Sequence, residues 1–136
     1  MIDIQDNTID LDFFKRLIKE IKNEPTRYLD IIDSFSDNQF KSKGKLLELI
    51  NSLNILTPDS SVAIFGCWYG SILVPALSPK VKRILAIDLD EVAIRIGKNR
   101  FFKNLNNVTW STGDIFKKHL GDYASTSLFI NTSCEH

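Results

Sequence analysis

Cysteine is scarce in this sequence, since only Cys67 and Cys134 are present and they lie far apart. Such a pair indicates neither a disulfide framework nor the Cys-x-x-Cys spacing of a metal site. Long apolar runs are also missing, because no stretch approaches the roughly 20 residues that span a bilayer. The first ten residues are acidic and lack the pattern of a signal peptide. The sequence therefore predicts a cytoplasmic protein without a membrane segment or a metal centre.

An excess of one charge is missing as well, because the 17 basic residues balance the 17 acidic residues. A neutral chain exerts no long-range attraction on nucleic acid or on anionic membranes. Basic clusters do occur at residues 41–45 and 95–103, but runs of this kind are usually solvated helix faces. The composition therefore disfavours nucleic acid as a partner but leaves it open.

What the sequence does contain is enough apolar material for one compact domain, with 43% hydrophobic residues among 136. Residues 1–57 form an N-terminal extension with apolar residues at helical spacing and no strand pattern. We expect three helices that pack on the domain, although their apolar faces could also form a lid or a partner surface. The first helix follows Asp10, a candidate N-cap, and ends before Pro25. The expected inward residues are Leu11, Phe14, Leu17, Ile18 and Ile21, then Tyr28, Leu29, Ile32 and Phe35, and finally Phe40, Leu46, Leu47, Ile50 and Leu53.

Residues 58–136 alternate short apolar runs with helical segments, which is typical of a parallel sheet covered by helices. Right-handed crossovers between successive strands would produce a three-layer, doubly wound α/β sheet of about four strands. Ligands of such sheets bind beyond the carboxyl ends of the strands. We predict strands at 61–65, 83–87, 107–110 and 127–130, and helices at 71–77, 91–103 and 115–120, with Val92, Ile96 and Phe102 facing inward.

Each predicted strand is followed by residues suited to bind a nucleoside. Gly66 and Gly70 would let a ligand approach the backbone closely, although such a segment can also be only a tight turn. Asp88 lies 22 residues after Gly66, where a carboxylate can accept hydrogen bonds from a ribose diol. Its alternative is capping of the next helix, for which Asp90 is better placed. Asp114 could bind an adenine amino group or cap the helix after it.

Together these segments resemble the successive motifs of the class I S-adenosylmethionine-dependent methyltransferases, a family with a Rossmann-like fold. The segments read VAIFGCWYGSILVP, ILAIDLDEVAIRIGKN, NVTWSTGDIF and SLFIN, and the resemblance covers about residues 60–131. It implies S-adenosyl-L-methionine as the cofactor and a strand order of 3-2-1-4. The glycine turn would line the methionine end of the cofactor, Asp88 would hold the ribose, and Asn131 would border the transferred methyl group. Adenine would lie between Leu89 and Ile115, with Asp114 at its amino group. The implied cofactor-binding residues are Gly66, Cys67, Trp68, Gly70, Asp88, Leu89, Asp114, Ile115 and Asn131.

The sequence departs from the family pattern at several positions. The first motif of the family has an acidic residue at the end of its strand and a central glycine in its turn, where this chain has Ile64 and Trp68. Trp68 could therefore either wall the cofactor pocket or fill it. Asn131 is not followed by the Pro-Pro-aromatic sequence of enzymes that methylate base amino groups, which disfavours that acceptor. Glu135 and His136 could act as a base or be solvated terminal residues.

The family's sheet continues through three further strands that this chain does not contain. We therefore expect a truncated fold whose fourth strand is an edge, covered by the N-terminal helices or by a second copy in a homodimer. The predicted function is the cofactor-binding half of a methyltransferase, with an unknown acceptor and no assignable catalytic residue. The alternative is a non-catalytic binding or interaction module. A nicotinamide dehydrogenase is disfavoured because Trp68 and Ser71 stand where Gly-x-Gly-x-x-Gly needs glycine, and no Gly-Lys-Ser/Thr indicates a phosphate loop.

Overall fold

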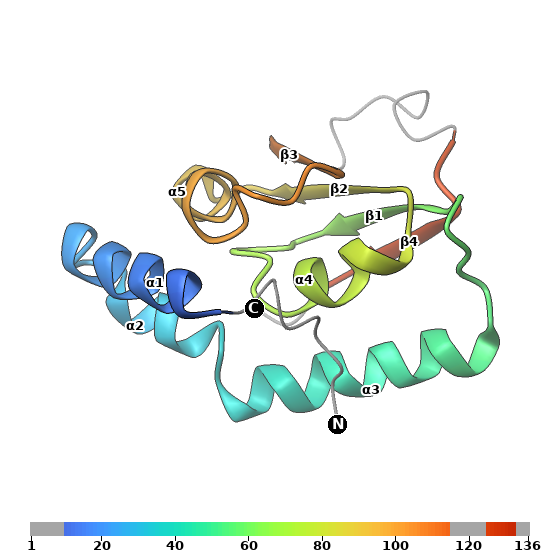
Figure 1. Ribbon diagram of the computed structural model, residues 1–136, viewed down its shortest axis with the longest axis horizontal. Coiled ribbons are helices and arrows are strands. Elements are labelled where there is room, and N and C mark those ends of the chain that lie inside the picture. Colours follow the sequence, from blue (N-terminus) through green and yellow to red (C-terminus); the bar gives the residue numbers. More distant parts are fainter. Residues whose placement is uncertain (1–9, 115–124, 133–136) are drawn as a thin grey trace.

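The computed structural model describes residues 10–114 and 125–132, which contain one parallel β-sheet with helices packed beneath it (Figure 1). The strand order β3-β2-β1-β4 confirms the predicted order, and every neighbouring pair is parallel. The strand that leads into the glycine turn, β1, is therefore an inner strand. The strands span β1 Ser61–Phe65, β2 Arg83–Asp88, β3 Val108–Thr112 and β4 Leu128–Asn131.

The main core lies on one face of this sheet, to which alternate strand residues point. The register aligns Val62 with Ile84 and Ile64 with Ala86. All four residues are at most 1% exposed. Because burial of one aliphatic side chain stabilises a fold by roughly 1.5–3 kcal/mol, this face holds the strands in their register.

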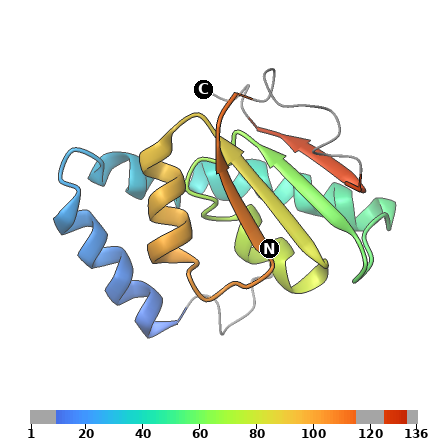
Figure 2. The same cartoon turned by 90° about the horizontal axis from the view of Figure 1, so that it is seen from above.

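The crossover helices cover that same face. α4 spans Leu73–Leu77 and continues into the 3-10 turn η1, Ser78–Lys80. α5 spans Glu91–Ile96 and continues into the π-helical turn η2, Gly97–Phe101. Their interior residues Ile96 and Phe102 are buried and Val92 packs against the core, as predicted. In Figure 2, α3 and α4 lie behind the sheet. The helix expected at 115–120 lies outside the described residues.

Three helices form an N-terminal layer beside this core (Figure 1). They are α1 Leu11–Asn23, α2 Tyr28–Asp33 and α3 Asp37–Leu53. Asp10 caps α1 as predicted, since its side chain accepts a hydrogen bond from the Phe13 amide at 2.9 Å. Ser36 caps α3 in the same way, and the helix ends at Asn54, whose φ of 52° is left-handed. Local capping chemistry thus sets where α1 and α3 begin and where α3 ends.

The prediction of which face α1 buries is wrong. Phe13 is 1% exposed, whereas Leu11, Phe14 and Ile18 are 70%, 52% and 54% exposed. Phe13 takes the inward position because its ring enters a cluster of phenylalanines from other elements, with ring centroids 5.7–5.8 Å away. Its partners are Phe35, Phe101 and Phe102. Of the five predicted residues, only Leu17 and Ile21 pack against the core.

A similar correction applies to the next two helices. In α2, Ile31 is fully buried and Phe35 after the helix packs against the core. In α3, Leu47 and Ile50 are buried and Leu46 packs against the core, as predicted. The predicted inward residues that are instead exposed are Tyr28, Leu29, Ile32 and Leu53. A broad apolar face predicts a helix, but the neighbouring elements decide which part of that face is covered.

Two ion pairs hold α1 against α5 and η2. Arg100 Nε lies 2.9 Å from Glu20 Oε1, and Arg95 Nη2 lies 2.6 Å from Glu24 Oε1. Glu20 is buried, so the Arg100 side chain supplies a counter-charge that this carboxylate needs. Two cations of the basic cluster at 95–103 therefore neutralise α1 carboxylates.

The outer edge of β4 pairs with no other strand among the described residues. The expected edge strand is thus present, and the homodimer that would cover it stays a prediction. In residues 10–114 and 125–132, no helix has the length and apolar character needed to cross a membrane.

Candidate functional site

The glycine turn, residues 66–70, connects β1 to the start of α4 and is tied to both neighbouring strands. The amides of Gly66 and Cys67 both donate to the carbonyl oxygen of Ile87, at 2.8 and 3.1 Å. On the other side, the Thr132 hydroxyl donates to the Gly66 carbonyl oxygen at 2.7 Å. The turn is therefore held between the carboxyl ends of β2 and β4, which is where ligands of parallel sheets bind.

Three residues of this turn have left-handed backbone angles: Gly66 at φ 70°, Trp68 at φ 54° and Gly70 at φ 70°. Trp68 is the residue that replaces the central glycine of the family motif. It keeps the backbone conformation that glycine would adopt, at a cost of roughly 1–2 kcal/mol for a residue with a Cβ. A tryptophan thus occupies a left-handed backbone conformation at the centre of this turn.

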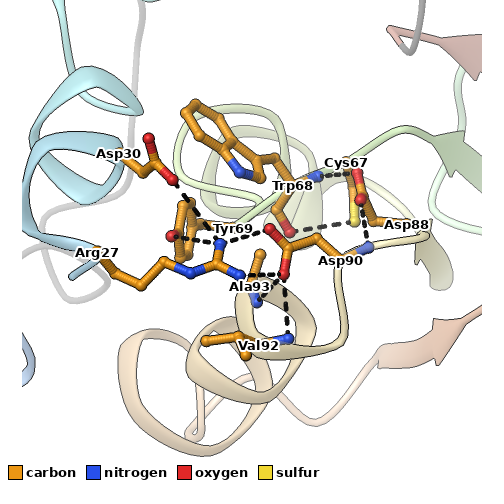
Figure 3. Close-up of polar contacts among 9 residues, drawn as sticks. All are labelled: Arg27, Asp30, Cys67, Trp68, Tyr69, Asp88, Asp90, Val92 and Ala93. Atoms are coloured by element: carbon orange, nitrogen blue, oxygen red, sulfur yellow. Dashed lines mark hydrogen bonds and ion pairs between the residues drawn. The ribbon is translucent and has the colours of Figure 1, made fainter. Parts of the chain in front are cut away.

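Asp88 holds the turn in this conformation (Figure 3). Its Oδ2 accepts a hydrogen bond from the Trp68 amide, and its Oδ1 accepts one from the Asp90 amide, both at 2.8 Å. The carboxylate therefore points toward the glycine turn. The capping role belongs to Asp90, whose Oδ1 accepts from the amides of Val92 and Ala93 at 3.1 and 3.2 Å. Asp88 therefore does not cap α5, and the alternative role considered for it in the sequence is excluded.

The other predicted residues that the structure describes lie at or just after the ends of the strands. Leu89 is 72% exposed, an apolar side chain in solvent beside the carboxylate. The Gly113 amide donates to the Asp88 carbonyl oxygen at 3.0 Å, which places the half-buried Asp114 at the end of β2. Asn131 is exposed and aligned with Phe65 at the end of β1. The four strand ends therefore meet at one rim, while Ile115 and the terminal pair Glu135 and His136 lie outside the described residues.

A cavity of about 30 Å³ lies between the glycine turn and the N-terminal layer. Its wall includes four buried polar residues, Ser34, Lys43, Ser71 and Thr132. The hydroxyls of Ser34 and Ser71 are 2.8 Å apart, so the residue that ends α2 is hydrogen-bonded to the residue that follows the turn. The space suffices for about one water molecule. The sequence analysis did not single out Ser34 or Lys43 as site residues. A helical pattern does not show which polar side chain will face a turn that is distant in the sequence.

The Cys67 thiol in this turn is not a nucleophile at neutral pH. Burial raises the pKa of Cys67 well above its ordinary range, and the nearby Asp88 carboxylate raises it further. The thiol lies 3.6 Å from the Trp68 carbonyl oxygen, to which it donates. Since the thiolate is the reactive form, Cys67 contributes packing and a weak donor rather than covalent chemistry.

Asp90 carries a second interaction that the sequence did not reveal, an ion pair with Arg27 (Figure 3). Burial alone would raise the pKa of Asp90. The hydrogen bonds from Arg27, Ala93 and Val92 outweigh that effect, so the pKa of Asp90 lies below its ordinary value. The charged form of this carboxylate is therefore favoured in the folded protein.

This shift predicts an acid-dependent loss of stability. A carboxylate with a lowered folded pKa stabilises the protein above its unfolded pKa of about 3.9, and this contribution is lost as pH falls through the folded pKa. We expect the free energy of unfolding, measured by urea denaturation, to fall below about pH 4 more steeply in the wild type than in Asp90→Asn. Asparagine still caps the helix, so the comparison isolates the charge. Identical acid slopes for the two proteins would contradict the assignment.

Comparison with solved structures identifies the fold. The N-methyltransferase NodS from Bradyrhizobium japonicum, in complex with S-adenosyl-L-homocysteine, matches with a TM-score of 0.54 and 24% identity over 79% of this chain and 50% of that chain. DhpI, solved in a DhpI-SAM-HEP complex, matches with a TM-score of 0.50 and 17% identity over 81% of this chain and 47% of that chain. This chain therefore shares the Rossmann-like α/β fold of these two proteins.

The resemblance of the motifs to this fold is thereby confirmed at the level of architecture. The chain spans half or less of the length of these two structures. No protein-family model matches the sequence, and no curated protein matches it either.

Proposed function

We propose that this chain binds S-adenosyl-L-methionine at the rim formed by its strand ends and that it is the cofactor-binding half of a methyltransferase. The observation that carries the proposal is the placement of the Asp88 carboxylate. It lies between the glycine turn and an exposed leucine, at the end of an inner pair of parallel strands. A carboxylate beside an apolar wall suits a ribose diol and the adjoining adenine ring.

The donors and acceptors at the rim fit the cofactor. Asp88 would accept hydrogen bonds from the ribose hydroxyls, because each oxygen that already accepts one amide keeps a second lone pair. Leu89 would pack on one side of the adenine, and Asp114 would accept from its amino group. The left-handed backbone at Gly66 keeps the turn open toward the methionine end.

When bound, the cofactor supplies a methyl group on a positively charged sulfur. The chain's own residues have to hold that sulfur in line with an acceptor atom, since positioning is the main protein contribution to such a transfer. Asn131, at the end of β4, would border the transferred methyl group. The next residue, the buried Thr132, holds this end of β4 in position, because its hydroxyl contacts the carbonyl oxygens of Phe65 and Gly66. The acceptor itself has no assigned site.

Calorimetric titration of the wild-type chain with S-adenosylhomocysteine tests the proposal. We expect saturable binding, and the absence of heat at millimolar ligand would overturn it.

A second candidate function, a non-catalytic interaction module, is favoured by the small cavity and by the Trp68 side chain in the turn. An intact Rossmann-like fold with a filled site would retain the architecture without binding the cofactor.

Replacement of Trp68 by glycine tests whether the indole fills the cofactor site or forms its wall. Glycine removes the strain of a left-handed tryptophan and opens the space beside the turn. We therefore expect Trp68→Gly to bind S-adenosylhomocysteine about 10-fold more tightly than the wild type, a gain of about 1.4 kcal/mol. Titration calorimetry measures the change. Weaker binding by the glycine variant would show instead that the indole forms a wall of the pocket.

A further inference from the structure

Arg27 joins the N-terminal layer to both loops of the proposed cofactor site. It lies directly before α2, and its guanidinium makes a two-point contact with Asp90. The Nη1···Oδ2 distance is 2.5 Å and the Nη2···Oδ1 distance is 2.9 Å. The two side chains are 24% and 27% exposed, so this pair is shielded from solvent more than an ordinary surface ion pair.

The same guanidinium also reaches the glycine turn. Arg27 Nη1 lies 3.5 Å from the hydroxyl of Tyr69, a residue that is fully buried. The Tyr69 ring packs against Trp68 with centroids 5.1 Å apart. One side chain of the N-terminal layer therefore contacts the loop after β1 and the loop after β2 (Figure 3).

Arg27 and Asp88 contact the same two loops. The Asp88 carboxylate binds the amides of Trp68 and Asp90, while the Arg27 guanidinium binds the side chains of Tyr69 and Asp90. Each loop is therefore held twice, once from within the sheet and once from α2. Movement of Asp90 away from Arg27 would also move the amide that orients Asp88.

We infer that Arg27 is a positioning residue of the cofactor site and that docking of α2 on the two loops is coupled to cofactor binding. The inference rests on the proposed function. Arg27 touches no reacting atom; it fixes the separation of the two loops between which Asp88 lies. Because coupling between two equilibria is reciprocal, the bound cofactor would in turn stabilise α2 against the loops.

The test compares Arg27→Gln with Arg95→Gln. The control variant breaks the Arg95–Glu24 pair, which joins the end of α1 to α5 at 2.6 Å but touches neither loop. We expect S-adenosylhomocysteine to bind about 10-fold more weakly to Arg27→Gln, within the usual range of coupling, and with unchanged affinity to Arg95→Gln. Titration calorimetry measures the affinities, and urea denaturation shows that both variants are folded.

Hydrogen exchange adds a readout that a purely structural role would not move. Addition of S-adenosylhomocysteine should slow amide exchange in α1 and α2 of the wild type and of Arg95→Gln, but not of Arg27→Gln.

If Arg27→Gln fails to fold, Arg27→Lys replaces it, since lysine keeps the charge and loses the two-point contact. Binding to the Arg27 variant as tight as to the wild type would overturn the inference and leave the proposed function intact. Absence of binding to the wild type itself would overturn both.

Discussion

Replacement of Asp88 by alanine is expected to weaken the binding of S-adenosylhomocysteine strongly and to destabilise the fold. The change removes the acceptor of two backbone amides, those of Trp68 and Asp90. Hydrogen bonds to a charged group contribute about 1.5–3 kcal/mol each, so we expect a loss of about 3 kcal/mol in the free energy of unfolding. Affinity should fall by about 100-fold or more, because the ribose acceptor and the turn that faces it are lost together.

Calorimetry and urea denaturation of the same variant separate the two effects. Asp88→Asn keeps one acceptor oxygen at nearly the same shape and should recover part of the stability without the charge. Asp59→Ala, which removes an exposed carboxylate just before the first residue of β1, at the end of that strand opposite the turn, should change neither quantity. Unaltered affinity in Asp88→Ala would remove the basis for placing the ribose at this residue.

Gly70→Ala should cause the largest loss of stability in the glycine turn. Gly70 has a φ of 70°, and a Cβ there would lie 2.8 Å from Val74 Cγ2 and 2.9 Å from Trp110 Cη2. Backbone strain of roughly 1–2 kcal/mol and overpacking of roughly 1–3 kcal/mol add to an expected loss of about 4 kcal/mol by urea denaturation. The lack of a side chain at Gly70 is thus required by the packing of the indole, whether or not its amide also faces the cofactor.

Gly97→Ala is the matched comparison, since its side chain would meet the same two atoms of the Trp110 indole. A Cβ at Gly97 would lie 2.7 Å from Trp110 Cζ3 and 2.8 Å from the Tyr69 carbonyl oxygen, but the backbone at Gly97 has an ordinary helical φ of −57°. Only the overpacking remains, and we expect a loss of about 2 kcal/mol. Gly44→Ala, in the middle of α3, should instead stabilise by up to about 1 kcal/mol through helix propensity. Equal stability of Gly70→Ala and the wild type would contradict the described packing of Trp110.

The sheet could be predicted from the sequence because its signals are local. Short apolar runs between glycine, proline and aspartate mark β1 to β4 to within one or two residues, and the predicted N-cap Asp10 is confirmed. The convergence of Gly66, Asp88 and Gly113 follows from strand order, because parallel strands deliver their carboxyl ends to one edge.

The contacts from the N-terminal layer could not be predicted in this way. Arg27 and Asp90 are separated by 63 positions, and no periodicity links them. Ser34 meets Ser71 for the same reason, through the docking of α2 on the turn. Such pairs form only when two helices or loops that are distant in the sequence pack against each other. Patterns over a few neighbouring residues do not predict that packing.

By itself, the sequence determined the order of strands and turns, the place of Asp88 at the end of its strand and the start of α1 after Asp10, because capping, turn chemistry and alternation act over a few residues. Only the tertiary structure decided that Phe13 rather than Phe14 enters the core, that Trp68 keeps a glycine-like backbone, and that Arg27 reaches Asp90. These outcomes result from competition among many side chains for the same interior space, and that competition is settled only when all the elements are packed together.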